Sequence, residues 1–172
     1  DVWTLKRMAS CRRATGDVEG ALDCYKRLEA LHPGNVPVAN NIGNCLLELG
    51  DVKEALKYYF KVDYLSGNSV KTMRPIAWCS FLDGNYSQSI EYYDKILALK
   101  PSPGDYINRA HVLLASGRVK EAVEDYGRAA SMSGVGKVSE TMEADMEYLL
   151  AAGVDKMLIY LILDQLRYDS RS

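Results

Sequence analysis

Residues 50–67, GDVKEALKYYFKVDYLSG, decide the fold, because the chain contains three more copies of this segment in the same register. The other copies are GDVEGALDCYKRLEALHP at 16–33, GNYSQSIEYYDKILALKP at 84–101 and GRVKEAVEDYGRAASMSG at 117–134. Successive copies begin 34, 34 and 33 residues apart. A fixed period of this length is the signature of a repeat protein, in which similar units stack on one another.

Each copy has the same landmarks: a leading glycine, a small residue five positions later and a tyrosine nine positions later. The small residues are Ala21, Ala55, Ser89 and Ala122, and the tyrosines are Tyr25, Tyr59, Tyr93 and Tyr126. We expect the glycine to end one helix in a left-handed conformation, and Asp17, Asp51 and Asn85 to cap the next one. Apolar residues three and four apart after the glycine predict an amphipathic second helix. Each unit is therefore predicted to be a helix–turn–helix.

A 34-residue helix–turn–helix with a small residue at one crossing and an aromatic residue four positions later resembles the tetratricopeptide repeat. The resemblance covers about residues 2–136 and divides them into units 2–35, 36–69, 70–103 and 104–136. It implies an all-α fold, a right-handed α-α superhelical solenoid of about four helix–turn–helix repeats plus a C-terminal helical pair, in one solenoid domain. The large aromatic residue that the family has near the start of each unit is Leu5, Ala39 and Met73 here, and only Tyr106 matches.

Residues 137–172 depart from the period. They are predicted to form two more helices, about 137–152 and 154–167, with Gly153 as the hinge. The favoured interpretation is a pair of capping helices and a tail. The segment KMLIYLILDQL is apolar on nearly every side, however, which is typical of a helix buried on more than one face. The alternative is therefore a homo-oligomer formed through residues 154–167.

The spacing of three cysteines is part of the same repeat. Cys11, Cys45 and Cys79 each lie five residues before a repeat glycine. Equivalent positions in stacked helices are about 8–10 Å apart or more, whereas a disulfide needs Cα atoms within about 7 Å. We therefore expect half-buried packing positions, since free cysteine behaves as a small hydrophobe, and neither a disulfide ladder nor a metal site.

Composition limits the classes of function. With 48% hydrophobic and 26% charged residues and a net charge of −2, the chain has the profile of a folded protein and no basic surplus for nucleic acid. The longest apolar run, residues 157–163, is too short to span a membrane. Because the chain begins at Asp1, we interpret it as a fragment. Its location in the cell is left open, with the cytoplasm favoured.

Nothing in the sequence indicates catalysis. The chain has two histidines and none of the glycine-rich, zinc-binding or nucleophile-elbow motifs. His32 is predicted to lie in a loop. His111 is predicted to lie in a first helix, as a packing or peptide-contact residue. We expect no enzyme, no cofactor and no metal.

Charge, in contrast, is distributed unevenly between first and second helices. Residues 2–15, 36–49, 70–82 and 103–116, the expected first helices, carry a net charge of +5, against −7 for the rest of the chain. In the family that the repeats resemble, first helices line the concave groove. A basic groove favours an acidic or C-terminal peptide partner, through steering of the encounter more than through affinity.

One branch of that family, the co-chaperone modules, holds terminal carboxylates of a chaperone tail with five groove residues. The matching positions here are Lys6, Ser10, Asn41, Lys71 and Pro75. Three of them keep the family residue, while Ser10 replaces an amide and Pro75 removes a guanidinium, although Arg74 is adjacent. A general peptide groove is preferred over a carboxylate clamp.

The sequence thus predicts a non-catalytic module that binds a protein or peptide in a basic concave groove. The alternative is a structural segment of a longer solenoid that assembles or self-associates through its ends. The candidate groove residues are Lys6, Ser10, Asn41, Asn44, Lys71, Arg74, Trp78, Phe81 and His111.

Overall fold

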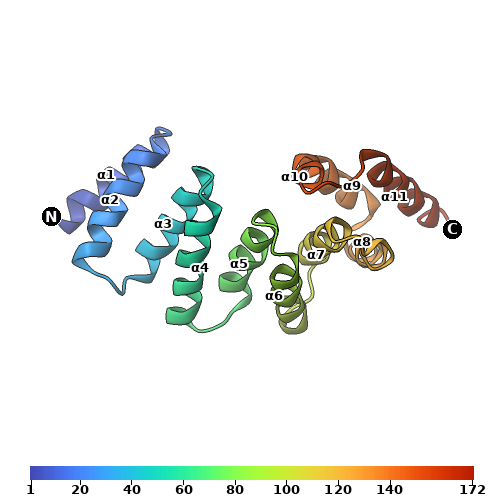
Figure 1. Cartoon of the computed structure of the whole chain (residues 1–172), viewed down its shortest axis with the longest axis horizontal. Coiled ribbons are helices and arrows are strands. Elements are labelled where there is room, and N and C mark those ends of the chain that lie inside the picture. Colours follow the sequence, from blue (N-terminus) through green and yellow to red (C-terminus); the bar gives the residue numbers. More distant parts are fainter. The chain divides into compact units, whose positions relative to one another are not determined.

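Eleven helices and no strands make up the structure, a computed structural model that describes all of residues 1–172 (Figure 1). The helices are α1 (Val2–Ala14), α2 (Val18–Leu31), α3 (Val36–Glu48), α4 (Val52–Ser66), α5 (Val70–Leu82), α6 (Tyr86–Leu99), α7 (Pro103–Ala115), α8 (Val119–Ser133), α9 (Val135–Ala144), α10 (Met146–Ala151) and α11 (Lys156–Asp169). None of them combines the length and the apolar character that a membrane span requires. The helices belong to two compact units, Asp1–Cys79 and Ser80–Ser172, with α5 contributing to both.

The turns between paired helices form as the landmarks predict. The leading glycines have φ angles between +79° and +83° at Gly16, Gly50, Gly84 and Gly117, a conformation that side chains with a Cβ rarely adopt. After three of them, Asp17, Asp51 and Asn85 accept a hydrogen bond from the backbone N–H three residues on, which confirms them as N-caps. Arg118 holds the fourth cap position and makes no such bond.

In the first unit, consecutive helices pack against one another from α1 to α4. The small landmark residues and tyrosines lie inside these contacts: Ala21 and Ala55 are fully buried, and Tyr25 and Tyr59 are 7% and 2% exposed. Gly43 on α3 lies directly against the ring of Tyr59. A Cβ added to Gly43 would lie 2.9 Å from Cε1 of Tyr59. The other first helices have alanine at this repeat position, at Ala9, Ala77 and Ala110.

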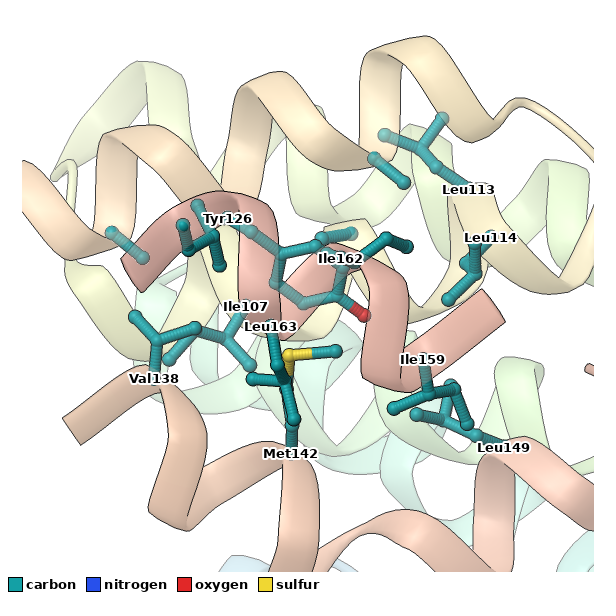
Figure 2. Packing of buried hydrophobic residues seen from close by; sticks show 14 of the residues in the cluster. Ile107, Leu113, Leu114, Tyr126, Val138, Met142, Leu149, Ile159, Ile162 and Leu163 are labelled. Carbon is teal, nitrogen blue, oxygen red and sulfur yellow. The ribbon is translucent and has the colours of Figure 1, made fainter. Parts of the chain in front are cut away.

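The second unit has one continuous core that involves α7 to α11. Figure 2 shows side chains from all five helices pointing into it, among them Ile107, Tyr126, Met142, Leu149 and Leu163. Each of these five is no more than 1% exposed. The C-terminal helices are therefore part of the main core of this unit.

The expected C-terminal pair is in fact three helices. The single helix predicted over 137–152 is interrupted at Asp145, which ends α9 and precedes α10. The following turn at Gly153 repeats the geometry of the other four, with φ of +87° and a hydrogen bond from the N–H of Val154 to the carbonyl of Leu149. The corresponding bond at the first turn joins Asp17 to Arg12. Residues 135–169 are thus a fifth helix–turn–helix pair whose first helix is broken.

The cysteines show one departure from expectation. Cys45 and Cys79 are fully buried and Cys24 is 2% exposed, whereas Cys11 is exposed. The reason is that α1 packs closely only against α2, while the equivalent helix α3 packs against both α2 and α4. All four are free thiols, and no group of three or more histidine, cysteine or acidic side chains is placed to hold a metal ion.

Candidate functional site

The first unit contains a hollow of about 620 Å³ bounded by α3, α4 and the start of α5, which we call the α3–α5 hollow. Its volume lies within the 300–1,000 Å³ typical of ligand-binding pockets. Aliphatic and proline side chains form part of its wall, and amide, hydroxyl and ammonium groups form the rest. The lining residues are Val36, Pro37, Asn40, Asn44, Tyr59, Val62, Ser66, Lys71, Thr72 and Pro75.

Asn44 is held at the base of the hollow by a tyrosine. The hydroxyl of Tyr59 donates a hydrogen bond of 2.6 Å to Oδ1 of Asn44. Burial raises the pKa of Tyr59 well above its usual value, so the hydroxyl keeps the proton that it donates. Because the oxygen of Asn44 accepts this bond, the two N–H donors of the amide are available to a ligand. Asn40 lies one helical turn earlier on α3 and lines the same hollow.

The N-terminus of α5 forms the opposite wall. Ser69 and Thr72 cap it reciprocally: the N–H of Thr72 donates to Oγ of Ser69, and the N–H of Ser69 donates to Oγ1 of Thr72. The hydroxyl of Thr72 also donates a 2.6 Å bond to the buried carboxylate of Asp63 on α4. These bonds join α4 to α5 and fix the segment that carries Lys71, the only charged residue that lines the hollow.

Pro75 has a structural consequence in the same wall. It lies inside α5 and has no N–H, so the carbonyl of Lys71, four residues earlier, lacks the donor that an α-helix would supply. Both residues line the hollow. The hollow therefore combines an ammonium group and amide groups with a wall that contains proline.

Only part of the predicted groove is gathered in this place. Of the nine candidates, Asn44 and Lys71 line the α3–α5 hollow. Lys6 and Ser10 lie on α1 around a shallow depression of about 260 Å³, together with Trp3, Arg7 and Cys11. Asn41 is half-buried on α3, and on α5 Arg74 is exposed while Trp78 is half-buried.

The other two candidates lie in the second unit and are buried. Phe81 is 3% exposed, and its ring centroid is 6.0 Å from that of Tyr86. His111 is fully buried. Its Nδ1 lies 2.6 Å from the hydroxyl of Tyr126 and its Nε2 lies 3.2 Å from Oδ2 of Asp145. His111 thus connects α7 with α8 and with the break between α9 and α10, which is a role in the core.

Several basic residues of the first helices are paired within the protein. Arg13 forms an ion pair with Glu48, and Arg12 lies 3.8 Å from Asp17. Arg109 binds Asp125 at 2.6 Å and Asp94 at 2.8 Å, and hydrogen bonding to Asp125 is the main reason that its pKa is raised. Such pairs cancel the positive charge that a basic groove would offer to a partner.

Several residues of the hollow were absent from the sequence-based candidates: Val36, Pro37, Asn40, Tyr59, Val62, Ser66, Thr72 and Pro75. One signal was available, since Asn40 and Asn44 are four residues apart in a predicted helix and must share a face. The contribution of α4 could not be found in this way. Tyr59, Val62 and Ser66 come from a second helix, whereas the groove was assigned to first helices only.

The fold and the turns define a class of protein, a repeat protein built from stacked helix–turn–helix pairs. Models of the tetratricopeptide repeat match residues 7–62 and 106–134. The chain is a member of the tetratricopeptide-repeat family, whose repeats act as protein-interaction modules.

Solved structures of this family have the same fold. MamA residues 41 to the end from Desulfovibrio magneticus RS-1 aligns with a TM-score of 0.75 and 15% identity, covering 99% of this chain and 97% of that one. TTC0263, a thermophilic TPR protein in Thermus thermophilus, aligns at 0.61 and 19% identity, covering 88% and 81%. YrrB, described as a TPR protein with an unusual peptide-binding site, aligns at 0.68 and 14% identity, covering 93% and 90%. No curated protein sequence matches the chain significantly.

Proposed function

We propose that the chain is a non-catalytic binding module whose α3–α5 hollow holds a peptide segment that bears a carboxylate. The observation that carries the proposal is the composition of the hollow: its only charged residue is Lys71, beside Asn40 and Asn44, and no carboxylate lines it. A carboxylate on a side chain or at a C-terminus would complement this charge. The description of YrrB as having a peptide-binding site supports the same class of ligand.

Two kinds of contact would contribute to binding, an ion pair with Lys71 and apolar packing. Lys71 is exposed, and an exposed ion pair contributes only about 0–1 kcal/mol, so it would steer and orient the ligand. Apolar contact with Val36, Val62 and Pro75 would supply most of the affinity, as buried anchors do in protein interfaces. The amides of Asn40 and Asn44 would donate to backbone carbonyls, which are unpaired in an extended peptide.

A longer partner would extend beyond the hollow over the rest of the first unit. Lys6 and Ser10 on α1, Asn41 on α3, and Arg74 and Trp78 on α5 are the further contacts in this proposal. His111 and Asp125, 0% and 1% exposed, are held by Tyr126 and Arg109, and in this proposal they serve the core and not catalysis.

A selection from a random peptide library tests the proposal. The full chain is immobilised, binding 12-residue peptides are selected, and their affinities are measured by fluorescence anisotropy for the wild type and for Lys71→Glu. We expect selected peptides to be acidic and to lose at least threefold in affinity with Lys71→Glu. Lys53→Glu is the matched control, because Lys53 is exposed on α4 and does not line the hollow.

Two results would count against the proposal. Peptides that bind both charge-reversal variants as tightly as the wild type would place recognition elsewhere on the chain. A selection that enriches no peptide would favour the structural alternative, in which the repeats serve as a segment of a longer solenoid.

A further inference from the structure

The second unit contains a small pocket between the α5–α6 turn and α10. Its volume is about 260 Å³, and all of its lining residues belong to the unit Ser80–Ser172. Phe81 at the end of α5, Tyr86 at the start of α6 and Tyr148 on α10 line it, and Asp83 is the only charged residue in its wall. We call it the aromatic pocket.

Two of these side chains depart from the repeat around the α5–α6 turn. Asp83 directly precedes the repeat glycine, where the other helix pairs have Thr15, Leu49, Ser116 and Ala152. Tyr86 comes two residues after the same glycine, where three other pairs have Val18, Val52 and Val119. The geometry of the turn is the same in all of these pairs, so it does not require a carboxylate or an aromatic ring at either position.

Tyr148 departs from the repeat in the same way. It lies five residues before Gly153, the position that the cysteines occupy in the first three pairs. Cys45, Cys79 and Val112 are fully buried at this position, whereas Tyr148 is 37% exposed and lines the pocket. Residues that stacking of the repeats does not explain are therefore gathered around one pocket.

The chemistry of the wall suits a cation. The face of an aromatic ring carries partial negative charge and attracts guanidinium and ammonium groups. Tyr86 is half-buried, and its ring is inclined by 38° to that of Phe81, so the two rings do not form a face-to-face stack. The carboxylate of Asp83 adds a full negative charge, and no basic residue lines the pocket.

Elsewhere the chain places its own cations over exposed aromatic rings. Cζ of Arg7 lies 4.8 Å from the ring centroid of Trp3, and Nζ of Lys156 lies 5.9 Å from that of Tyr160. The wall of the aromatic pocket supplies no such cation. A positive group from a partner molecule would therefore complement it.

We infer that the aromatic pocket binds an arginine side chain of a partner protein. A guanidinium is planar and weakly hydrated, stacks on aromatic faces, and pairs with a carboxylate such as that of Asp83 through two parallel hydrogen bonds. The size of the pocket agrees with this occupant. Its volume of about 260 Å³ lies below the roughly 300–1,000 Å³ of pockets that hold whole small molecules, which suits a single side chain.

The test is a titration of the full chain with N-acetyl-arginine amide, followed by amide NMR spectra of the isotopically labelled protein. At millimolar concentrations of this probe, the signals of residues 82–86 and 148–152 should shift together and saturate. N-acetyl-citrulline amide is the matched ligand, because it keeps the shape of arginine and lacks the charge. It should bind about two- to fivefold more weakly.

Variants assign the binding to the pocket. Tyr86→Val introduces the residue that three other turns have at this position, and Asp83→Asn removes the charge without a change of shape. Each should weaken the binding of N-acetyl-arginine amide about two- to fivefold, with otherwise unchanged spectra. Asp164→Asn is the control and should have no effect, because Asp164 is exposed on α11 and does not line the pocket.

Three results would overturn the inference. Equal binding of the arginine and citrulline compounds would show that charge is not recognised. Binding that is unchanged in both Tyr86→Val and Asp83→Asn, or shifts spread over both units, would place the arginine elsewhere. Tighter binding of N-acetyl-trimethyllysine amide than of the arginine compound would assign the pocket to a methylated lysine instead.

Discussion

Substitution of Gly43 by alanine should destabilise the protein, although alanine is the better helix former. Gly43 lies inside α3, and a Cβ there would be 2.9 Å from Cε1 of Tyr59 and 3.2 Å from Cδ1 and Cζ. A contact under 3.0 Å forces the ring to move. The ring cannot move freely, because it is 2% exposed and its hydroxyl is bonded to Asn44 at 2.6 Å.

The expected magnitude is the difference of two effects. Removal of a glycine from a helix interior stabilises by about 0.8–1 kcal/mol. Overpacking of a well-packed core costs about 1–3 kcal/mol, and disturbance of the Tyr59–Asn44 bond adds about 1 kcal/mol. We therefore expect Gly43→Ala to lower the free energy of unfolding by about 1–3 kcal/mol.

The assay is urea unfolding followed by circular dichroism, with Gly127→Ala as the matched control. Gly127 also lies inside a helix, α8, but no heavy atom comes within 4 Å of a Cβ added there. Gly127→Ala should raise the free energy of unfolding by about 0.5–1 kcal/mol. If Gly43→Ala stabilised the protein as much as Gly127→Ala, Tyr59 would not pack against α3 as described. The position of Tyr59 in the α3–α5 hollow would then be wrong.

Three further predictions follow from the cores and the cysteines. Tyr126→Phe removes the hydroxyl that contacts the buried Nδ1 of His111, and it should lower the free energy of unfolding, measured in urea, by about 1–3 kcal/mol. The control Tyr64→Phe, at an 87% exposed residue, should not change the free energy of unfolding. Equal effects of the two substitutions would contradict the role of His111. With a thiol reagent, Cys11 should react at once and Cys24, Cys45 and Cys79 only on unfolding, and a fast phase that persists in Cys11→Ser would refute this. Burial and the hydrogen bond to Glu29 raise the pKa of Tyr58 to about 12, so the folded state keeps a proton that the unfolded state loses near pH 10. Stability should therefore fall as the pH rises from about 10 to about 12. Tyr58→Phe should make this fall less steep, and an equal slope in both proteins would contradict the assignment.

The repeat turns were predictable because their causes are local. A positive φ at Gly16 or Gly50 needs glycine, and a cap three residues before a free N–H needs a short side-chain acceptor such as Asp17. The buried tyrosines were predictable for a similar reason, since an amphipathic helix with a fixed period can turn only one face inward. Both features depend on residues close together in the sequence.

The fifth helix pair could not be recognised from the sequence. It shares with the other four pairs the spacing of its buried residues but not the identity of those residues. Ile159 and Leu163 replace the small residue and the tyrosine of the other repeats, and Asp155 adds a residue after the turn. The break at Asp145 further displaces the first helix from the period. The sequence pattern alone therefore showed two apolar helices and not a repeat.

The pairing of several arginines was not predictable, because ion pairs across helices are not visible in the sequence. Arg13 and Glu48 are 35 residues apart, and Arg109 reaches Asp94 and Asp125 from two different neighbouring helices. Net charge over the first helices already subtracts Glu48 but not Asp94 or Asp125, so it counts Arg109 as available to a partner. Of the predicted positive residues, the hollow contains only Lys71, and its neighbours Tyr59 and Thr72 depend on how α4 packs beside α5.

A double-mutant cycle tests whether Lys71 in the α3–α5 hollow recognises a carboxylate on a peptide. The affinity of a selected peptide and of its amidated, uncharged form is measured with the wild type and with Lys71→Met. If Lys71 contacts the carboxylate, removal of the peptide charge weakens binding to the wild type by about two- to fivefold, a coupling of up to about 1 kcal/mol. The same removal should have almost no effect on binding to Lys71→Met. An equal loss in both proteins would mean that Lys71 does not contact the carboxylate and that the hollow is not the recognition site.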